Sequence, residues 1–358
     1  MGANGYRVAL IGYGLGGRVF HAPLVQATPG MHVASIVTSD PSRRREAATR
    51  YPEARVLERV EDLWAAAQEH DLVVVATPNR FHGPLALTAL EAGLPVVIDK
   101  PFAPTADEAE AVLAAARARG LLLSVFQNRR WDGDFLTVQR LLDDGPDGAL
   151  GPVVRFESRF ERWRPERDAE AWRERGDPAE GGGLLLDLGS HLIDQAMVLF
   201  GPPTHVYAEV ERRRAGAEVD DDSFVALAHA NGVRSHLWFS TVARLLGPRI
   251  RLLGLRGAYE KHGLDGQEPA LADGGQPDAA GWGREPEERW GTLASDDGER
   301  QVETAPGDYP AYYAGIAESL RTGAPPPVDP SDSIAVLRVI EAALRSARSG
   351  TVEDLRDG

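Results

Sequence analysis

The chain contains no cysteine. This absence excludes disulfide bonds, thiolate nucleophiles and cysteine-ligated metals together. It is compatible with a reducing compartment, and we expect a cytoplasmic protein.

Lysine is nearly absent as well. The 39 basic residues include only two lysines, Lys100 and Lys261, and the others are arginines. Lys100 follows the apolar run "VVID", where an ordinary surface cation of this chain would be arginine. A compact ammonium with a tunable pKa can do chemistry that a planar guanidinium cannot, so the composition favours a specific role for Lys100.

Long apolar runs and a basic excess are also missing. No run reaches 18 apolar residues, which argues against a membrane span, and the N-terminus has no signal-peptide pattern. The formal charge of −15 argues against a nucleic-acid partner, because such partners need basic patches. The expected partner is a small molecule, with neither nucleic acid nor membrane.

The first third of the chain alternates short apolar runs with helix-like stretches. The runs are apolar throughout, as is typical of parallel strands buried on both faces. They cover residues 6–11, 33–37, 72–76, 96–98 and 121–125, and the helix-like stretches include 84–92 and 106–119. Repeated strand–helix–strand units predict a doubly wound parallel sheet of the Rossmann type.

The pattern of apolar and polar residues changes after about residue 125. Residues 153–159 and 206–211 alternate apolar and polar side chains, as strands of a one-sided antiparallel sheet do. Further strand candidates are 224–230, 235–240 and 250–253, followed by a stretch from 263 to 307 that we expect to be mostly irregular, and a final helix over 331–349. With 358 residues, two domains are expected. We predict an α/β protein: a Rossmann dinucleotide-binding domain over 1–124 and a C-terminal α+β domain over 125–358. The second domain carries a large, mostly antiparallel open sheet, and the final helix is expected near the domain junction.

The first apolar run leads into a G-x-G-x-x-G motif. The motif consists of Gly12, Tyr13, Gly14, Leu15, Gly16 and Gly17. Gly12 permits a tight turn, Gly14 lets the backbone approach a pyrophosphate, and Gly17 permits close helix–strand packing. Because the motif follows a strand and opens a helix, it predicts a dinucleotide site, with a ligand-free glycine-rich turn as the alternative.

The residues that follow the second strand are expected to distinguish NADP from NAD. NAD sites usually place an acid there, but Thr38 stands at that position, followed by Ser39 and Arg43. Two hydroxyls and a cation suit a 2′-phosphate, so NADP is favoured over NAD. Asp40 keeps NAD open, although its place before Pro41 is typical of a turn.

The third and fourth strands end in polar residues. Ligands of open α/β sheets bind beyond the carboxyl ends of the strands, so these residues are predicted to contact the cofactor. They are Thr77, Pro78, Asn79 and His82 after the third strand, and Asp99, Lys100 and Pro101 after the fourth. Lys100 can also hydrogen-bond a hydroxyl or a developing alkoxide of a substrate, which makes it a catalytic candidate.

A second segment, "GGGLLLDLGSHLID" from 181 to 194, carries an acid and a histidine. Asp187 and His191 are four residues apart and would share one face of a helix. A histidine has the pKa to move an alcohol proton near neutrality. A purely structural pair is the alternative, and two ligands without a third argue against a metal.

The motifs GYGLGG, ATPNRFH, DKP, QNRRWDGDF and GGGLLLDLGSHLIDQ occur in this order. In this, the chain resembles the glucose–fructose oxidoreductase, inositol dehydrogenase and rhizopine-catabolism (Gfo/Idh/MocA) family, especially its NADP-dependent scyllo-inositol dehydrogenase-like subgroup. The resemblance implies that Lys100, Asp187 and His191 surround the reacting carbinol, with His191 as the acid/base. It also implies a homodimer or homotetramer formed through the open sheet. The chain departs from the family at Asp99, where glutamate is usual.

The prediction is therefore an NADP-dependent dehydrogenase acting on a secondary hydroxyl of a cyclic polyol or sugar, with NAD possible. Asn128 and Arg130 are further candidates for contacts to substrate hydroxyls. Trp163 offers a ring for stacking on a sugar, with a place in the core as the alternative. An NAD-dependent glycosidase that works by oxidation and elimination, and a non-catalytic cofactor-binding sensor, stay open.

Overall fold

The computed structural model describes residues 5–168, 172–177 and 180–356, which form two compact units. Unit 1 comprises the described residues up to Asn128 together with Gln267–Trp282 and Asp308–Ile334. Unit 2 comprises the described residues of Arg129–Gly266, Gly283–Gly307 and Ala335–Gly358. We expected one boundary after residue 124, whereas two later segments here belong to the N-terminal unit.

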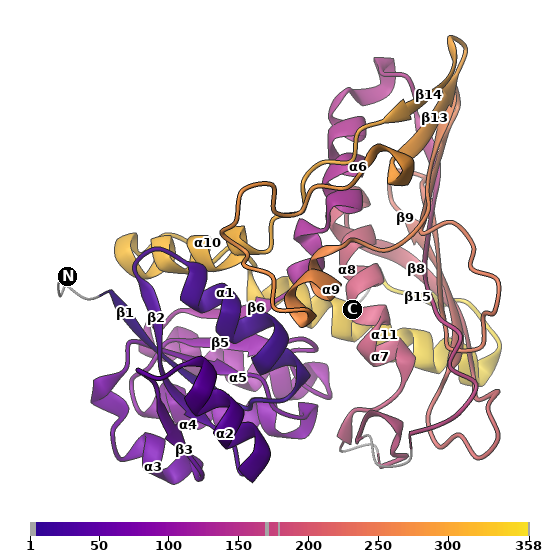
Figure 1. Ribbon diagram of the computed structural model, residues 1–358. Coiled ribbons are helices and arrows are strands. Elements are labelled where there is room, and N and C mark those ends of the chain that lie inside the picture. The colour runs from indigo at the N-terminus through magenta and orange to yellow at the C-terminus, as the bar shows by residue number, and fades with distance from the viewer. Residues whose placement is uncertain (1–4, 169–171, 178–179, 357–358) are drawn as a thin grey trace. The chain divides into compact units, whose positions relative to one another are not determined.

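Unit 1 is built on a six-stranded parallel sheet of order β3-β2-β1-β4-β5-β6 (Figure 1). Its strands are β1 (Tyr6–Ile11), β2 (Met31–Val37), β3 (Arg55–Leu57), β4 (Leu72–Val75), β5 (Val96–Asp99) and β6 (Leu123–Phe126). The doubly wound fold is thus confirmed, and β3 is the one strand that the apolar runs did not predict. It has only three residues, none of them buried, so it lacks the apolar signature of the others.

The helices of unit 1 lie between these strands. They are η1 (Gly16–His21), α1 (Ala22–Ala27), α2 (Pro41–Arg50), α3 (Val60–Trp64), η2 (Ala67–Glu69), η3 (Asn79–Phe81), α4 (His82–Glu91) and α5 (Ala106–Arg119), with α9 (Gln267–Ala272) and α10 (Pro310–Thr322) from the later segments. α4 packs on β4 and β5 and contacts α5, whereas α1 packs on β2 and α10. α11 (Pro330–Ser349) begins in unit 1 and continues in unit 2.

The ends of α5 show why its predicted bounds match the observed ones. The Thr105 hydroxyl accepts a hydrogen bond from the Glu108 amide at the first turn. Gly120 closes the helix in the left-handed conformation, which glycine adopts without steric cost. Both signals are local in the sequence and therefore readable from it.

Unit 2 is built on a nine-stranded sheet of order β14-β13-β12-β11-β7-β10-β9-β8-β15. The strands are β7 (Val153–Glu161), β8 (Pro203–Glu211), β9 (Asp222–His229), β10 (Arg234–Ser240), β11 (Ile250–Gly254), β12 (Gly257–Lys261), β13 (Gly291–Ser295), β14 (Gly298–Val302) and β15 (Glu353–Asp354). Only β7 and β10 pair in parallel, so the prediction of a mostly antiparallel sheet is confirmed.

The segment from 263 to 307 is more regular than we predicted. It forms α9, η8 (Glu287–Arg289) and the hairpin of β13 and β14, which extends one edge of the sheet. β14 is exposed at nearly every position, and polar residues dominate it. An edge strand of this kind carries no apolar alternation, which is why the sequence pattern missed it.

In unit 2, α7 (Leu184–Asp187) and α8 (Gly189–Phe200) contact β10. The other helices are η4 (Asn128–Trp131), α6 (Gly133–Asp143), η5 (Gly145–Asp147) and η6 (Trp172–Glu174). In β10, Leu237 and Phe239 are fully buried, whereas His236 and Trp238, which alternate with them, are only half-buried. The sheet therefore has one covered and one open face.

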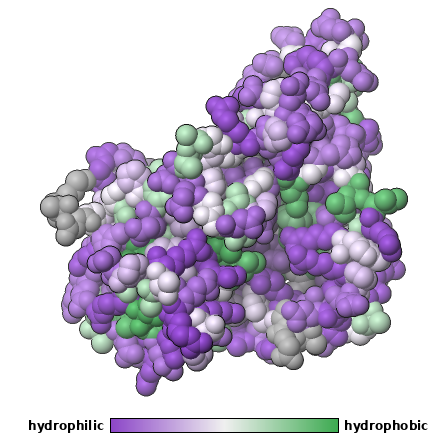
Figure 2. All heavy atoms as spheres, viewed as in Figure 1, coloured by the Kyte–Doolittle hydropathy of each residue, from purple (hydrophilic) through white to green (hydrophobic). Residues whose placement is uncertain are grey.

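The visible surface in Figure 2 is mostly hydrophilic, with small separate hydrophobic groups. This agrees with the acidic composition of the chain. Within the described residues, no helix has both the length and the apolarity that a membrane crossing requires.

Candidate active site

The glycine-rich loop between β1 and η1 has the geometry of a nucleotide cradle. Gly12 has φ of 100°, and a Cβ there would collide with the Ala76 carbonyl oxygen. A Cβ at Gly17 would collide with the Gly12 carbonyl oxygen, so both positions require glycine. At Gly14, by contrast, the only atom near a built Cβ is Arg43 Nη1 at 3.8 Å. The backbone at Gly14 is therefore open for the approach of a phosphate group.

The residues after β2 include those that we expected to distinguish NADP from NAD. Asp40 caps α2, and its carboxylate accepts a hydrogen bond from the Arg43 amide at 2.9 Å, which lowers the pKa of Asp40. That carboxylate is thus committed to the helix start. Arg43 instead extends its guanidinium toward Gly14, while Thr38 is buried and Ser39 is exposed.

The loops after β4 and β5 are tied together by His82. Its imidazole is buried, with Nδ1 at 2.8 Å from the Pro101 carbonyl and Nε2 at 2.9 Å from the Thr77 carbonyl. Burial lowers the pKa of His82. Both ring nitrogens contact backbone, so this side chain supports the loops that hold Thr77, Pro78 and Lys100.

Asp99 and Lys100 stand at the carboxyl end of β5. The Asp99 carboxylate accepts a hydrogen bond from the Lys100 amide at 2.9 Å and lies 3.6 Å from His21 Nε2. Burial by itself would raise the pKa of Asp99, but the contact with His21 and the charges of Lys100 and His82 hold it below its usual range. An ionised carboxylate thus sits next to the candidate catalytic lysine.

In unit 2, Asp187 and His191 lie on two consecutive helices rather than on one. α7 ends at Asp187 and α8 starts at Gly189, so the expectation of a single helix is wrong. The break stays short because the Ser190 hydroxyl donates to the Asp187 carbonyl at 3.1 Å. His191 is buried, and Arg173 Nε lies 3.7 Å from an Asp187 carboxylate oxygen.

A buried acid organises the start of α7. Asp220 accepts a hydrogen bond from the Leu185 amide at 2.7 Å and one from the Ser223 hydroxyl at 3.0 Å. Burial raises its pKa to about 6 despite these bonds. No local pattern predicts this contact, because Asp220 is more than thirty residues away along the chain.

Arg130 is held by a partner that we did not foresee. Its Nε and Nη2 donate to the two carboxylate oxygens of Asp194 at 2.8 and 2.6 Å. Asp194 lies on α8, one turn beyond His191, so the pair fixes the start of that helix. These two donors are therefore already used, whereas we expected Arg130 to contact substrate hydroxyls.

The two other predicted substrate contacts differ in exposure. Asn128 is buried and begins η4. Trp163 is 46% exposed, and the Arg244 guanidinium lies 5.4 Å from its ring centroid. A place for Trp163 in the core is thus excluded.

A buried polar network beside α8 was not predicted from the sequence. Asp134 pairs with Arg249 at 3.2 Å, and Arg249 donates to the Gln195 side chain at 3.1 Å. The Gln195 amide in turn donates to the Arg129 carbonyl at 2.8 Å. Asp132 contacts Arg129 at 3.2 Å, and burial raises the pKa of Asp132 to about 8.

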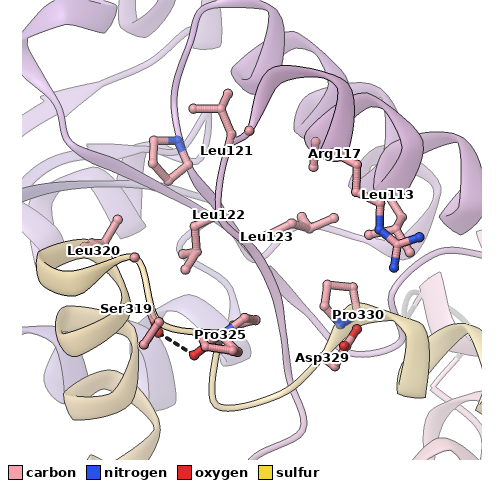
Figure 3. Close-up of a pocket in the computed structure, with 16 residues that line it drawn as sticks. Leu113, Arg117, Leu121, Leu122, Leu123, Ser319, Leu320, Pro325, Asp329 and Pro330 are labelled. Carbon is pink, nitrogen blue, oxygen red and sulfur yellow. Dashed lines mark hydrogen bonds between the residues drawn. The ribbon is translucent and has the colours of Figure 1, made fainter.

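A cavity of about 530 Å³ lies at the opposite end of the parallel sheet. Pro95 and Leu122 line it and directly precede β5 and β6, so it opens at the amino ends of these strands. In Figure 3, Leu113, Leu121 and Leu320 surround it. None of the predicted site residues lines this cavity. Among residues 5–168, 172–177 and 180–356, no group of three or more His, Asp or Glu side chains could hold a metal ion.

Comparisons with known proteins agree with this geometry. Residues 6–127 match the family model described as "Oxidoreductase family, NAD-binding Rossmann fold". Residues 146–355 match "Oxidoreductase family, C-terminal alpha/beta domain". Both models are those of the Gfo/Idh/MocA family.

Individual relatives cover nearly the whole chain. The oxidoreductase YdgJ of Escherichia coli is 41% identical over 97% of both chains. The scyllo-inositol 2-dehydrogenase (NADP(+)) IolW of Bacillus subtilis is 38% identical over 96% of this chain and 94% of its own. The solved structure of YvaA from Bacillus subtilis has a TM-score of 0.91 at 35% identity and covers 99% of this chain and 100% of its own. This chain therefore belongs to the Gfo/Idh/MocA family of oxidoreductases.

Proposed function

We propose that the protein is an NADP-dependent dehydrogenase that acts on a secondary hydroxyl of a cyclic polyol or sugar of the inositol type. The proposal rests on the set of Lys100, Asp187 and His191, which the resemblance of their motifs assigns to the family's catalytic lysine, aspartate and histidine. The relative IolW, whose name gives scyllo-inositol as substrate and NADP(+) as cofactor, supports the finer assignment.

The cofactor residues fit a dinucleotide with a 2′-phosphate. Gly12, Gly14 and Gly17 would hold the pyrophosphate, while Arg43, with Thr38 and Ser39, would hold the 2′-phosphate. The commitment of Asp40 to the start of α2 supports NADP over NAD, because it takes away the carboxylate that would otherwise accept from ribose hydroxyls. When bound, the nicotinamide would supply the hydride acceptor.

The remaining residues would handle the proton. His191 takes the proton of the substrate hydroxyl as general base. Lys100 donates a hydrogen bond to the reacting oxygen, and Asp187 orients the substrate and the histidine. Asn128 and Trp163 would contact the rest of the polyol. The bidentate pair with Asp194 supports a positioning role for Arg130.

The test is a substrate panel of inositols, monosaccharides and their keto forms, run with NADP and with NAD. A polyol dehydrogenase forms NADPH in proportion to the polyol consumed. A glycosidase would release sugar at constant cofactor, and a sensor would bind cofactor without turnover. Either of the last two results would overturn the proposal.

Two variants test the residue roles within the same panel. His191→Asn should lower kcat by about 10²-fold or more while the cofactor still binds, because general acid–base catalysis contributes about 10²–10⁴-fold. Arg43→Ala should weaken NADP by about tenfold and leave NAD unchanged, since only NADP carries the 2′-phosphate. An active asparagine variant would remove the role of His191, and equal weakening of both cofactors would refute the phosphate assignment.

We also propose that the open face of the unit 2 sheet forms a homodimer or homotetramer. Phe224, His236 and Trp238 form an aromatic cluster on this face, with ring centroids 5.2 to 6.1 Å apart, and the Arg159 guanidinium lies 4.0 Å from the Trp238 ring. Aromatic and arginine side chains are enriched at such interfaces. Trp238→Glu should give a monomer in light scattering, and an unchanged mass would refute this interface.

A further inference from the structure

A buried histidine lies behind the candidate catalytic lysine. His21 is the last residue of η1, and its side chain is completely inaccessible to solvent. Its Nε2 lies 3.6 Å from an Asp99 carboxylate oxygen, and its Nδ1 lies 2.6 Å from the Tyr313 hydroxyl. All three residues belong to unit 1. Three segments far apart in the sequence are thus joined at one imidazole.

The position of the protons follows from the partners. Burial raises the pKa of Tyr313 well above its usual value, so the phenol keeps its hydrogen and can donate it to Nδ1 of His21. A neutral imidazole that accepts at Nδ1 carries its hydrogen on Nε2, where it faces the Asp99 carboxylate. A charged imidazole would also place a hydrogen there. Either form thus presents an N–H to Asp99.

Both oxygens of the Asp99 carboxylate are confined. Oδ1, which faces His21, also accepts a hydrogen bond from the Lys100 amide at 2.9 Å. Oδ2 lies so close to Gly16 that a Cβ there would collide with it. A glutamate, longer by one methylene, would extend its carboxylate into His21 or the glycine-rich loop. The shorter acid of this chain therefore fits a space that His21 and Gly16 define.

We propose that His21 is a positioning residue: it holds the Asp99 carboxylate, and through it the Lys100 segment, in the place where the nicotinamide end of the cofactor binds. Ligands of this fold bind beyond the carboxyl ends of the strands, where this segment stands. The consequence for turnover rests on the proposed dehydrogenase function, but the consequence for cofactor binding does not. The competing explanation is that His21 only fills the core, where its ring lies 4.4 Å from that of Phe126.

Three substitutions separate these explanations. His21→Gln places an amide nitrogen near the position of Nε2 and keeps the donor to Asp99. His21→Asn places its amide near Nδ1 and keeps only a partner for Tyr313. His21→Phe preserves the ring and its packing but removes the hydrogen bond with Tyr313 and the polar contact with Asp99. Thermal unfolding of each variant shows whether it folds.

The measurement compares two ligands on each variant. NADPH contains the nicotinamide, whereas 2′,5′-ADP contains only the adenosine half with its phosphates. If His21 positions Asp99, the asparagine and phenylalanine variants should bind NADPH about tenfold more weakly and lose about tenfold in kcat, since a small misplacement of a positioned group is costly. The glutamine variant should stay within about threefold of wild type, and all variants should bind 2′,5′-ADP with wild-type affinity.

Two outcomes would overturn the proposal. If the asparagine and glutamine variants behave alike, the donor to Asp99 does not matter. If 2′,5′-ADP weakens together with NADPH, the effect is a general loss of structure. Failure of the proposed function has a different signature, because the wild-type protein would then oxidise no polyol while the ligand comparison still gives its answer.

A size-compensation experiment on Asp99 gives an independent check. Asp99→Glu should weaken NADPH because the longer side chain meets His21 and Gly16. Combining it with His21→Ser opens room for the extra methylene, so the double variant should bind NADPH more tightly than Asp99→Glu alone. A glutamate variant with wild-type affinity would show that the space is not confined.

Discussion

The two regions that hold the only lysines of the chain place the same side chain in different surroundings. Lys100 stands half-buried at the carboxyl end of β5, next to the glycine-rich loop of unit 1. Lys261 lies completely buried at the end of β12 in unit 2. Its ammonium donates to the His262 carbonyl at 3.0 Å and to the Arg289 carbonyl at 2.7 Å, and lies 2.8 Å from the Glu285 carboxylate.

The surroundings of Lys261 explain why this chain keeps a lysine there. Three acceptors converge on the Lys261 ammonium, which has three donors on one atom, and a planar guanidinium would not fit that arrangement. The composition therefore marks positions that need a compact cation. It does not separate a catalytic lysine from a structural one, because that depends on what surrounds the ammonium.

The largest effect is expected where Lys261 is removed. Lys261→Met removes the buried cation beside the nearly buried Glu285 carboxylate, which then keeps only the more exposed Arg289 at 3.1 Å. Breaking such a buried pair costs about 3–5 kcal/mol of unfolding free energy. Thermal unfolding should show a midpoint lower by about ten degrees or more. Adding Glu285→Gln to Lys261→Met should recover part of the lost stability. A Lys261→Met variant as stable as wild type would show that the buried pair does not stabilise unit 2.

A smaller effect, of a different kind, is expected at Lys100. Both Lys100→Arg and Lys100→Met should lower kcat by about 10²-fold, which corresponds to about 3 kcal/mol, because the compact ammonium is lost in each. Steady-state kinetics measure this loss, and the thermal midpoint should stay near that of wild type. A fully active arginine variant would mean that the region of Lys100 needs only a positive charge.

The two regions also treat a carboxyl group in opposite ways. The pKa of Asp99 is lowered by its contact with His21, whereas burial raises the pKa of Asp132 to about 8. Between pH 4 and 8 Asp132 is protonated in the folded protein and ionised in the unfolded chain, so stability falls as the pH rises through this window.

Asp132→Asn should remove that dependence, which is worth up to about 1.4 kcal/mol per pH unit. Urea unfolding at pH 5 and at pH 7 measures the change. A variant that keeps the wild-type slope would assign the buried proton to another carboxyl group of the same network, such as Asp134.

The smallest effect is expected at an exposed arginine. Arg321 pairs with Glu318 on α10, and both side chains are about half exposed. Arg321→Lys should change the unfolding free energy by less than about 0.5 kcal/mol, because exposed ion pairs contribute little. A larger change would mean that arginine has a specific role even on the surface. The scarcity of lysine would then not mark positions that need a compact cation.

The predictions from the sequence are correct where nearby residues specify the structure, and they fail where residues distant in the chain do so. All of β4, the last four residues of β1 and the first three of β5 are buried, so they appear in the sequence as apolar runs. The short edge strand β3 and the polar edge strand β14 are specified by pairing with their neighbours, and the sequence pattern did not reveal them. The partner of Arg130 was missed for the same reason, since Asp194 is 64 residues away.

By itself, the sequence determined the doubly wound sheet, the glycine-rich loop and the ends of α5. These features depend on burial patterns and conformational preferences within a few residues. Only the tertiary structure decided the burial of Lys261 among its three acceptors, the contact of His21 with Asp99 and Tyr313, and the raised pKa of Asp132. Each depends on acceptors, charges or desolvation supplied by residues distant in the chain, which no local pattern contains.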